Sequence, residues 1–350
     1  MSQAGASASP TPDAPVVPRA PSATWRTVRY VAGAILGAAA FYVCFATTQW
    51  PQFIASFRTA HVEWVVAAVI SVLLTLALVT ARWALLVDAN ASARSWRALW
   101  DSVVVGQAVN IVFPLRFGEG ARLAYMCHKL GFPAGRVILS LAVERTFDVG
   151  AFGTTVLILT VIGWTPDAGS GAVPKILILA STAIAAVASF AWLIPVGGRS
   201  LRRRLGTQSS IGRWIETQEI GIRNGWTSVT RPHLLIATVL LTASIVIAAA
   251  STNLLIFRAF GLQVPAVTAL ALLAVLQLGT AVVSVPGNLG VFHYLTVITL
   301  GALHVPRSTA LAAAVVLHAV SLGPKVALGG LALAAMPLRR RRVAADGREA

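Results

Sequence analysis

Charged residues are scarce in this sequence, and their scarcity excludes an ordinary soluble domain. Only 11% of the 350 residues are charged and 57% are hydrophobic, whereas a soluble domain carries about a quarter charged residues. Several apolar runs approach or exceed the roughly 20 residues that a helix needs to cross a bilayer. Because these runs are continuous rather than alternating, they favour helices over barrel strands. We therefore predict an all-α polytopic membrane protein.

Signatures of enzymes and of metal sites are also missing. The sequence has no P-loop, no Gly-x-Ser-x-Gly elbow, no cysteine pair at thioredoxin spacing and no His/Cys/Asp cluster at metal-ligand spacing. We expect no metal, no cofactor and no enzymatic activity, although Glu119 or Glu144 could serve as a lone general base. The net charge of +16 would suit nucleic acid. The basic residues stand in short loops between apolar runs, however, so we expect no nucleic-acid partner.

Six apolar runs predict full spans and two predict broken segments. The full spans are expected at about 28–48, 64–87, 137–163, 174–195, 233–257 and 308–336. The first broken segment, 99–113, is stopped by Pro114. The second, 267–285, is stopped by Pro286-Gly287 and resumes at 291–303. Proline removes a helix hydrogen bond and glycine loosens the backbone, so each site should interrupt its helix.

The loop charges predict the orientation. Four of the 28 Lys and Arg residues fall in expected outer loops, namely Arg58, Lys175, Arg258 and Arg307. The loop 196–231 carries seven arginines against two glutamates, and the tail 339–350 opens with four arginines. Because positive residues collect on the cytosolic side, we expect both termini in the cytosol and the chain in the cell inner (cytoplasmic) membrane. Arg82, at the end of a span, is expected to snorkel to that side.

This orientation requires each broken segment to enter and leave on one side, as a re-entrant helical hairpin. The order span, span, hairpin, span then occurs twice with opposite orientation, in halves at about 26–165 and 172–338. That arrangement is an inverted-topology repeat. We expect disordered cytosol-facing residues at 1–25, which are rich in Ala, Pro and Ser, and a basic cytosolic tail at 339–350.

The polar residues of the first half gather around the first interruption and in the next span. They are Asn110, Arg116, Glu119, Arg122, Glu144, Arg145 and Asp148. Charged groups in a bilayer are costly and usually mark function or a paired structural site. Glu144 and Asp148 are four residues apart, so they share a helix face, and Arg116 and Arg122 are their expected partners. Such a cluster could bind a phosphate through its arginines, or could only lock the broken segment onto the bundle.

The second half offers a different set of candidates, which are Asn288, His293, His318 and Lys325. Glycines around Asn288 permit an unwound backbone that could bind a polar group. Lys325 stands roughly 21 Å along the helix from Arg339, too deep to snorkel. It could contact an anionic headgroup or pair with Glu144 or Asp148. The two histidines could be packing residues, ligands or a proton relay.

At these residues the sequence resembles the lysylphosphatidylglycerol synthase transmembrane family, also described as flippase-like domain proteins. The family pattern is Asn-x-x-x-Pro-x-Arg-x-Gly-Glu-x-x-Arg, followed further on by Glu-Arg-x-x-Asp. It is met by Asn110, Pro114, Arg116, Gly118, Glu119, Arg122, Glu144, Arg145 and Asp148. In the second-half pattern, Pro-Gly-Gly-x-Gly-x-x-Glu, Asn288 and His293 depart from the family, and His318 lies near an expected arginine.

The resemblance implies a lipid flippase or lipid-transport role for a transmembrane domain at 26–338. In bifunctional members this domain moves aminoacylated phosphatidylglycerol that a separate soluble domain makes. We expect a stand-alone member that does not aminoacylate lipids. The expected partner is an anionic phospholipid or an isoprenoid or polyprenyl-linked lipid. An intramembrane lipid-modifying enzyme, an accessory protein that binds a lipid-synthesis enzyme, and a homo-oligomer remain open.

Overall fold

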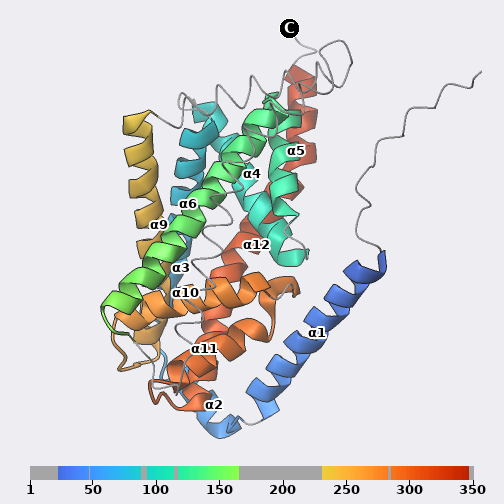
Figure 1. Cartoon of the computed structure of the whole chain (residues 1–350). Helices are drawn as coiled ribbons and strands as arrows, with labels where there is room; N and C mark the ends of the chain where they lie inside the picture. Colours follow the sequence, from blue (N-terminus) through green and yellow to red (C-terminus); the bar gives the residue numbers. More distant parts are fainter. Residues whose placement is uncertain are drawn as a thin grey trace, which may run out of the picture.

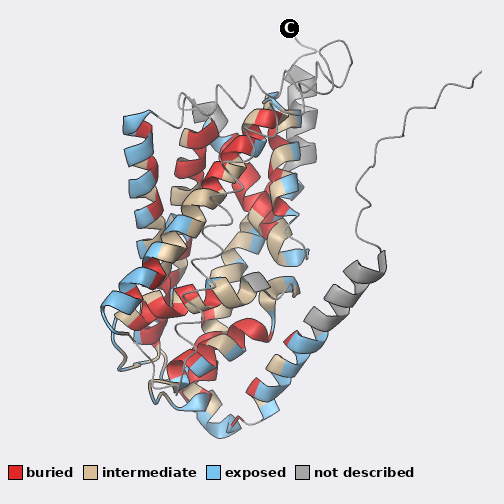
Figure 2. Ribbon diagram, viewed as in Figure 1, coloured by how far each residue is buried: buried red, intermediate tan, exposed pale blue. Residues whose placement is uncertain are grey.

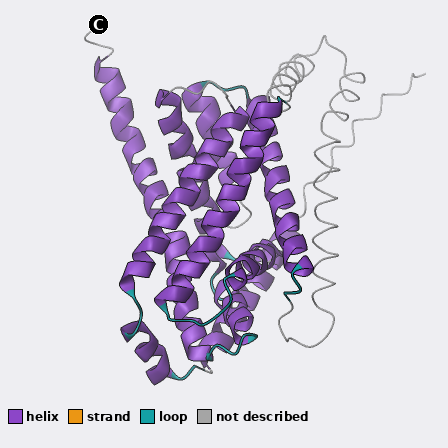
Figure 3. Cartoon of the chain, turned by 90° about the vertical axis from the view of Figure 1, so that its left-hand side faces the viewer, coloured by secondary structure: helices purple, strands orange, loops and turns teal. Residues whose placement is uncertain are grey.

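The described part of the chain is helical throughout. The computed structural model describes residues 23–46, 48–87, 93–113, 117–164, 231–282 and 285–346, and within these ranges it contains ten α-helices, one 3-10 helix and no strand (Figures 1 and 3). The all-α fold class is therefore confirmed. The predicted span 174–195 and, except for Arg231, the predicted loop 196–231 lie outside the described residues.

The helices follow the predicted order closely. They are α1 (Ala23–Ala46), α2 (Trp50–Arg58), α3 (Val62–Val87), α4 (Ala93–Val112), α5 (Gly118–Leu130), α6 (Ala134–Val161), α9 (Pro232–Ala259), α10 (Val267–Val282), η1 (Pro286–Asn288), α11 (Val291–Gly301) and α12 (Arg307–Asp346). Two short helices, α2 and α5, were not predicted. Two boundaries also differ, because α1 begins inside the expected disordered tail and α12 continues as a helix into the expected basic tail.

Three helices are long and apolar enough to cross a membrane within the described residues. They are α3, α9 and the part of α12 at Arg307–Ala335. The 28-residue α6 is also long enough, at about 42 Å, but it carries four charged residues. The chain is thus a membrane protein by composition and helix length.

The first and second long apolar helices, α3 and α9, run antiparallel and pack along their length. The backbone N–H of His61, next to the start of α3, donates to the carbonyl of Ala259 at the end of α9 (2.8 Å). Midway, Ser71 Oγ donates to the carbonyl of Ala248 (2.7 Å). Small polar side chains that bond between helices hold apolar helices together where burial alone provides little attraction.

Three of the four basic residues expected in outer loops lie at one end of the bundle. Arg58 ends α2, Arg258 lies in the last turn of α9 and Arg307 begins α12. The His61–Ala259 bond joins the start of α3 to the end of α9, and a contact between Ser56 Oγ and Thr309 Oγ1 (3.2 Å) joins α2 to α12. Lys175 lies outside the described residues.

Each half of the described chain has its own apolar core (Figure 2). One core joins α3, α4, α5 and α6 around Trp83, Leu99 and Met126. The other joins α9, α10, α11 and α12, together with α1 and α3, around Phe257, Leu300 and Leu311. Because α3 contributes to both cores, it holds the two halves together.

Candidate functional site

The predicted carboxylates of α6 do lie on one face, and that face is turned into the bundle. Glu144 is buried, with a side chain only 4% exposed, and Asp148 is partly buried one turn further on. Arg145 lies on the edge of the same face, and its Nη1 bonds to Asp148 Oδ2 at 3.2 Å. The helix spacing of three and four residues therefore brings these three charges together as expected.

The first break is the interruption at Pro114 between α4 and α5. The helix that follows it, α5, supplies the partners that face α6. Arg122 Nη2 donates to Glu144 Oε2 at 2.8 Å, and Glu119 pairs with Arg145. The Arg122 guanidinium also lies 3.9 Å from the centre of the Trp83 ring. Stacking and a charge-assisted bond together fix the orientation of the guanidinium.

Arg82 of α3 completes the cluster and corrects the prediction that it snorkels to the surface. Its side chain is only 2% exposed, and Nη2 lies 2.6 Å from Asp148 Oδ1 and 3.5 Å from Glu144 Oε1. Its Nη1 donates to Thr242 Oγ1 on α9 at 3.2 Å. Near the end of a helix an arginine can turn either outward or inward, and here the buried Glu144 and the partly buried Asp148 draw it inward.

We name these six side chains the charge cluster: Arg82, Glu119, Arg122, Glu144, Arg145 and Asp148. The cluster has three positive and three negative groups, so it is neutral when all are ionised. Even so, Arg82 Nε, Arg122 Nε and Glu119 Oε2 are buried and bond to nothing among the described residues. The cluster therefore keeps spare hydrogen-bonding capacity without a surplus of charge.

Close backbone contact between α4 and α5 positions the cluster beside the first break. The N–H of Gly118 donates to Asn110 Oδ1 at 2.7 Å, so Asn110 caps the start of α5 rather than facing the carboxylates. A Cβ at Gly118 would overlap the carbonyl oxygen of Gly106, and one at Gly106 would come within 2.6 Å of Arg122 Cγ. Arg116, predicted as a partner of Glu144, lies outside the described residues.

The second break, at residues 285–290 between α10 and α11, is formed by unusual backbone conformations rather than by charged side chains. Gly287, Asn288 and Gly290 all have positive φ, at 61°, 52° and 83°. A Cβ at Gly290 would overlap the backbone of Gly37, so α1 crosses the break at close range. Gly287 and Gly290 thus permit both the turn and the approach of α1.

His318 of α12 holds the second break in place. Its Nε2 lies 2.7 Å from the carbonyl oxygen of Gly287, so Nε2 carries the hydrogen and donates it. The His293 ring lies 4.8 Å from the His318 ring, centre to centre. His293 is only 4% exposed, and its Nδ1 has no partner among the described residues. The structure thus brings the two predicted histidines together at the second break.

Lys325 joins neither the histidines nor the carboxylates through any direct bond. Glu144 and Asp148 are occupied by Arg82, Arg122 and Arg145, which corrects the alternative that either acid pairs with Lys325. Within the described residues Lys325 makes no ion pair or hydrogen bond, and part of its side chain stays accessible. In the same part of the chain, no three His, Cys, Asp or Glu residues gather as a metal site.

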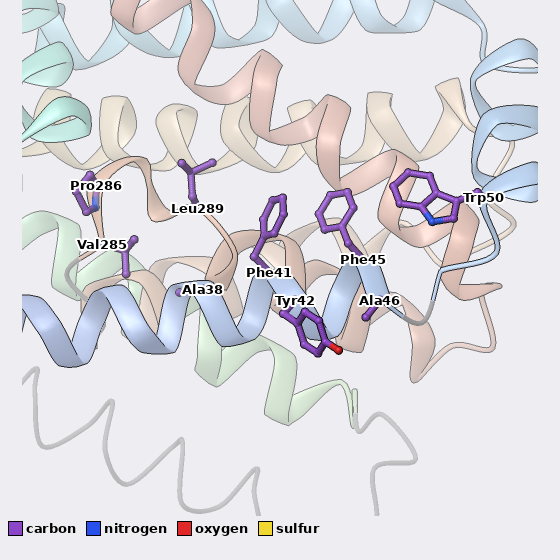
Figure 4. Close-up of a pocket in the computed structure, with 10 residues that line it drawn as sticks. Ala38, Phe41, Tyr42, Phe45, Ala46, Trp50, Val285, Pro286 and Leu289 are labelled. Atoms are coloured by element: carbon purple, nitrogen blue, oxygen red, sulfur yellow. The ribbon is translucent and has the colours of Figure 1, made fainter.

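An apolar groove of about 760 Å³ runs along α1 and reaches the second break. Figure 4 shows Phe41 and Phe45 directed from α1 to one side of the groove, Leu289 and Pro286 near one end, and Trp50 at the other. Aliphatic and aromatic walls suit a hydrocarbon chain better than a polar solute. Sequence inspection did not identify this groove, because it forms only where α1 meets residues 285–289.

One comparison with known proteins identifies a family. The family model described as "Lysylphosphatidylglycerol synthase TM region" matches residues 30–329, which include the charge cluster, both breaks and Lys325. No curated protein matches the chain by sequence.

Proposed function

We propose that this chain, which belongs to the lysylphosphatidylglycerol synthase TM region family, moves an anionic lipid across the cytoplasmic membrane. The lipid would be a phospholipid or an isoprenoid or polyprenyl-linked lipid, and both chain termini would face the cytosol. The charge cluster would contact the headgroup during its passage. The apolar tails would remain in the surrounding bilayer, because only the headgroup must cross the low-dielectric core.

The observation that carries this proposal is the spare bonding capacity of the charge cluster. Buried polar groups in folded proteins are nearly always bonded, yet Arg82 and Arg122 each keep a free Nε–H and Glu119 keeps a free carboxylate oxygen among the described residues. A cluster that only locked α5 onto α6 would gain stability by using these atoms. Free donors beside a break in the helix suit a polar group that arrives and leaves.

The neutral charge cluster requires that a positive charge accompany any anion that binds to it. With three cations and three anions the empty site is neutral, so a bound phosphate adds an uncompensated negative charge in a low-dielectric region. Protonation of Glu144 or Asp148, each of which contacts two arginines, would restore neutrality. We therefore propose that a proton or another cation accompanies the headgroup, with His318 as a further candidate proton carrier.

The order of helices supports two gates related by an inverted repeat. In each half a long helix is followed by two shorter helices with a break between them and then by another long helix: α3, α4, α5, α6 and α9, α10, α11, α12. The antiparallel packing of α3 on α9 is the relation that inversion requires. We propose that α4–α5 and α10–α11 are re-entrant hairpins that open the site alternately to the two sides.

A translocation assay tests the proposal. Purified protein is placed in liposomes that contain fluorescent phosphatidylglycerol or, separately, a fluorescent polyprenyl phosphate, and headgroup exposure is followed with a membrane-impermeant quencher. We expect faster exposure than in protein-free liposomes. The acceleration should be lost in Arg116→Ala/Arg122→Ala and kept in Arg58→Ala, which removes an exposed arginine distant from the charge cluster. Equal rates in the double variant and the wild type would contradict the proposal.

One observation favours an intramembrane lipid-modifying enzyme as a second candidate. We propose for this second candidate that Glu119, whose Oε2 is buried and unbonded among the described residues, acts as a general base beside an arginine-held phosphate. Mass spectrometry of lipids from cells that carry the protein, compared with cells carrying Glu119→Gln, distinguishes the two functions. A lipid species that only the wild type makes would favour the enzyme.

A further inference from the structure

Lys325 is a deep cation without a counter-charge in the described residues. It lies four residues before Gly329 and so shares a helix face with it, and Gly329 touches the backbone of Val104 on α4. Lys325 therefore lies on the face of α12 that packs against the second half of α4. The carboxylates inside the described bundle have other partners.

His318 extends this face of α12 toward the second break, where its ring adjoins that of His293 on α11. His318 lies seven residues before Lys325, about two turns or 10 Å along the axis, and it bonds to Gly287. Side chains in a helix lean toward its N-terminus, so the Lys325 side chain extends from its own turn toward His318. The adjoining His293 has a buried Nδ1 that bonds to no described residue.

We infer that Lys325, His318 and His293 form an anion site at the second break that binds the phosphate of a lipid headgroup. The inference rests on the proposed function and names a second position on the path. The site differs from the charge cluster in its electrostatics, because the cluster is neutral whereas Lys325 supplies an uncompensated positive charge. A bare cation at this depth is costly, and a bound phosphate removes that cost while its oxygens accept bonds from the Lys325 ammonium and from an Nδ1–H of His293. His318 donates its hydrogen to Gly287 and so positions the break beside the site.

The surroundings identify a lipid phosphate rather than a free one. The apolar groove reaches Pro286 and Leu289 of the same break, next to the Gly287 carbonyl that His318 holds. A lipid whose phosphate lies on the α12 side of the break can therefore place a hydrocarbon chain on the α1 side. Inorganic phosphate would leave the groove without a role.

A binding titration tests the site without requiring transport. Full-length protein in detergent is titrated with short-chain phosphatidylglycerol, with phosphatidylcholine of the same chains and with inorganic phosphate, and bound lipid is counted by native mass spectrometry. In Lys325→Met we expect phosphatidylglycerol affinity to fall roughly 10–100-fold, the effect of one lost charge-assisted bond. Lys325→Arg should bind nearly as well as wild type. Lys129→Met, which removes an exposed lysine at the end of α5, should be unchanged.

Two further measurements distinguish an effect of the variant on lipid binding from an effect on folding or on transport. Because Lys325→Met removes a charge that has no partner within the described ranges, its melting temperature should not fall below that of the wild type. Unchanged phosphatidylglycerol affinity in Lys325→Met, an equal loss for phosphatidylcholine, or inorganic phosphate that binds as tightly as the lipid would each overturn the inference. Lysine-dependent binding without headgroup movement in liposomes would contradict the proposed function and leave this site standing.

Discussion

Replacing Arg82 by Met should destabilise the protein far more than its position near a helix end suggests. The guanidinium is buried and joins three helices, through Asp148 and Glu144 on α6 and Thr242 on α9. Methionine retains an apolar side chain of moderate length but removes the charge and every one of these bonds. The buried Glu144 and the partly buried Asp148 then lose a counter-charge, and Asp148 keeps only the bond to the partly exposed Arg145.

The magnitude follows from the burial of the ion pairs. Removing one partner of a buried ion pair costs about 3–5 kcal/mol, because the remaining charge is stranded. Replacing an arginine that snorkels to the surface would change the free energy of unfolding by no more than about 0.5 kcal/mol. In the double variant Arg82→Met/Asp148→Asn the stranded charge is removed as well. We therefore expect the double variant to lose less stability than the sum of the two single variants, with a coupling of about 0.5–3 kcal/mol.

The free energy of unfolding is measured by titrating sodium dodecyl sulfate into mixed micelles, with helix content as the signal. Arg58→Met at the exposed end of α2 is the matched control and should change the free energy by no more than about 0.5 kcal/mol. A loss of less than about 1 kcal/mol in Arg82→Met, or strict additivity with Asp148→Asn, would refute the reasoning that places Arg82 in the charge cluster.

The same titration checks three more expectations. Gly118→Ala should cost about 1–3 kcal/mol by forcing α5 away from the Gly106 carbonyl, whereas Gly120→Ala, whose Cβ meets nothing within 4 Å, should be neutral or slightly stabilising. Gly329→Ala should likewise separate α12 from α4 at a cost of about 1–3 kcal/mol, and its neighbour Gly330→Ala should not. His318→Phe should cost about 1–3 kcal/mol by leaving the Gly287 carbonyl unbonded. Equal effects within either glycine pair, or a neutral His318→Phe, would contradict the packing described here.

The helix boundaries could be predicted where local chemistry determines them. Pro114 and Pro286 indicated both interruptions, and α4 ends at Val112 while α11 begins at Val291. The separate helix α5 was missed, although Gly131 in the left-handed conformation and the basic residues His128 and Lys129 in its last turn are typical of a helix C-terminus.

The composition of the charge cluster could be predicted only in part. The face shared by Glu144 and Asp148 follows from helix periodicity alone, and the partnership of Glu144 with Arg122 was expected. The role of Arg82 could not be derived, because the rotation of α3 against α6 decides whether that side chain faces lipid or carboxylate. The stacking of Arg122 on Trp83 depends on the same packing.

At the second break, too, the local backbone could be predicted from the sequence but the tertiary contacts could not. Positive φ at Gly287 and Gly290 agrees with the glycine pattern in the sequence. The bond from His318 to Gly287 joins residues 31 positions apart, so no local sequence pattern predicts it. Whether Lys325 is paired depends on where every acidic residue lies, which only the folded chain determines.

The initial rate of headgroup exposure in liposomes, measured with wild type and with Glu144→Gln, tests the central claim most directly. Both proteins are first shown to be monodisperse and helical, and protein-free liposomes set the background. We predict that the wild type accelerates exposure of phosphatidylglycerol or polyprenyl phosphate and that Glu144→Gln returns the rate to background, because the arginines then lose their buried counter-charge. A wild-type rate equal to background, or a variant as fast as wild type, would contradict the account.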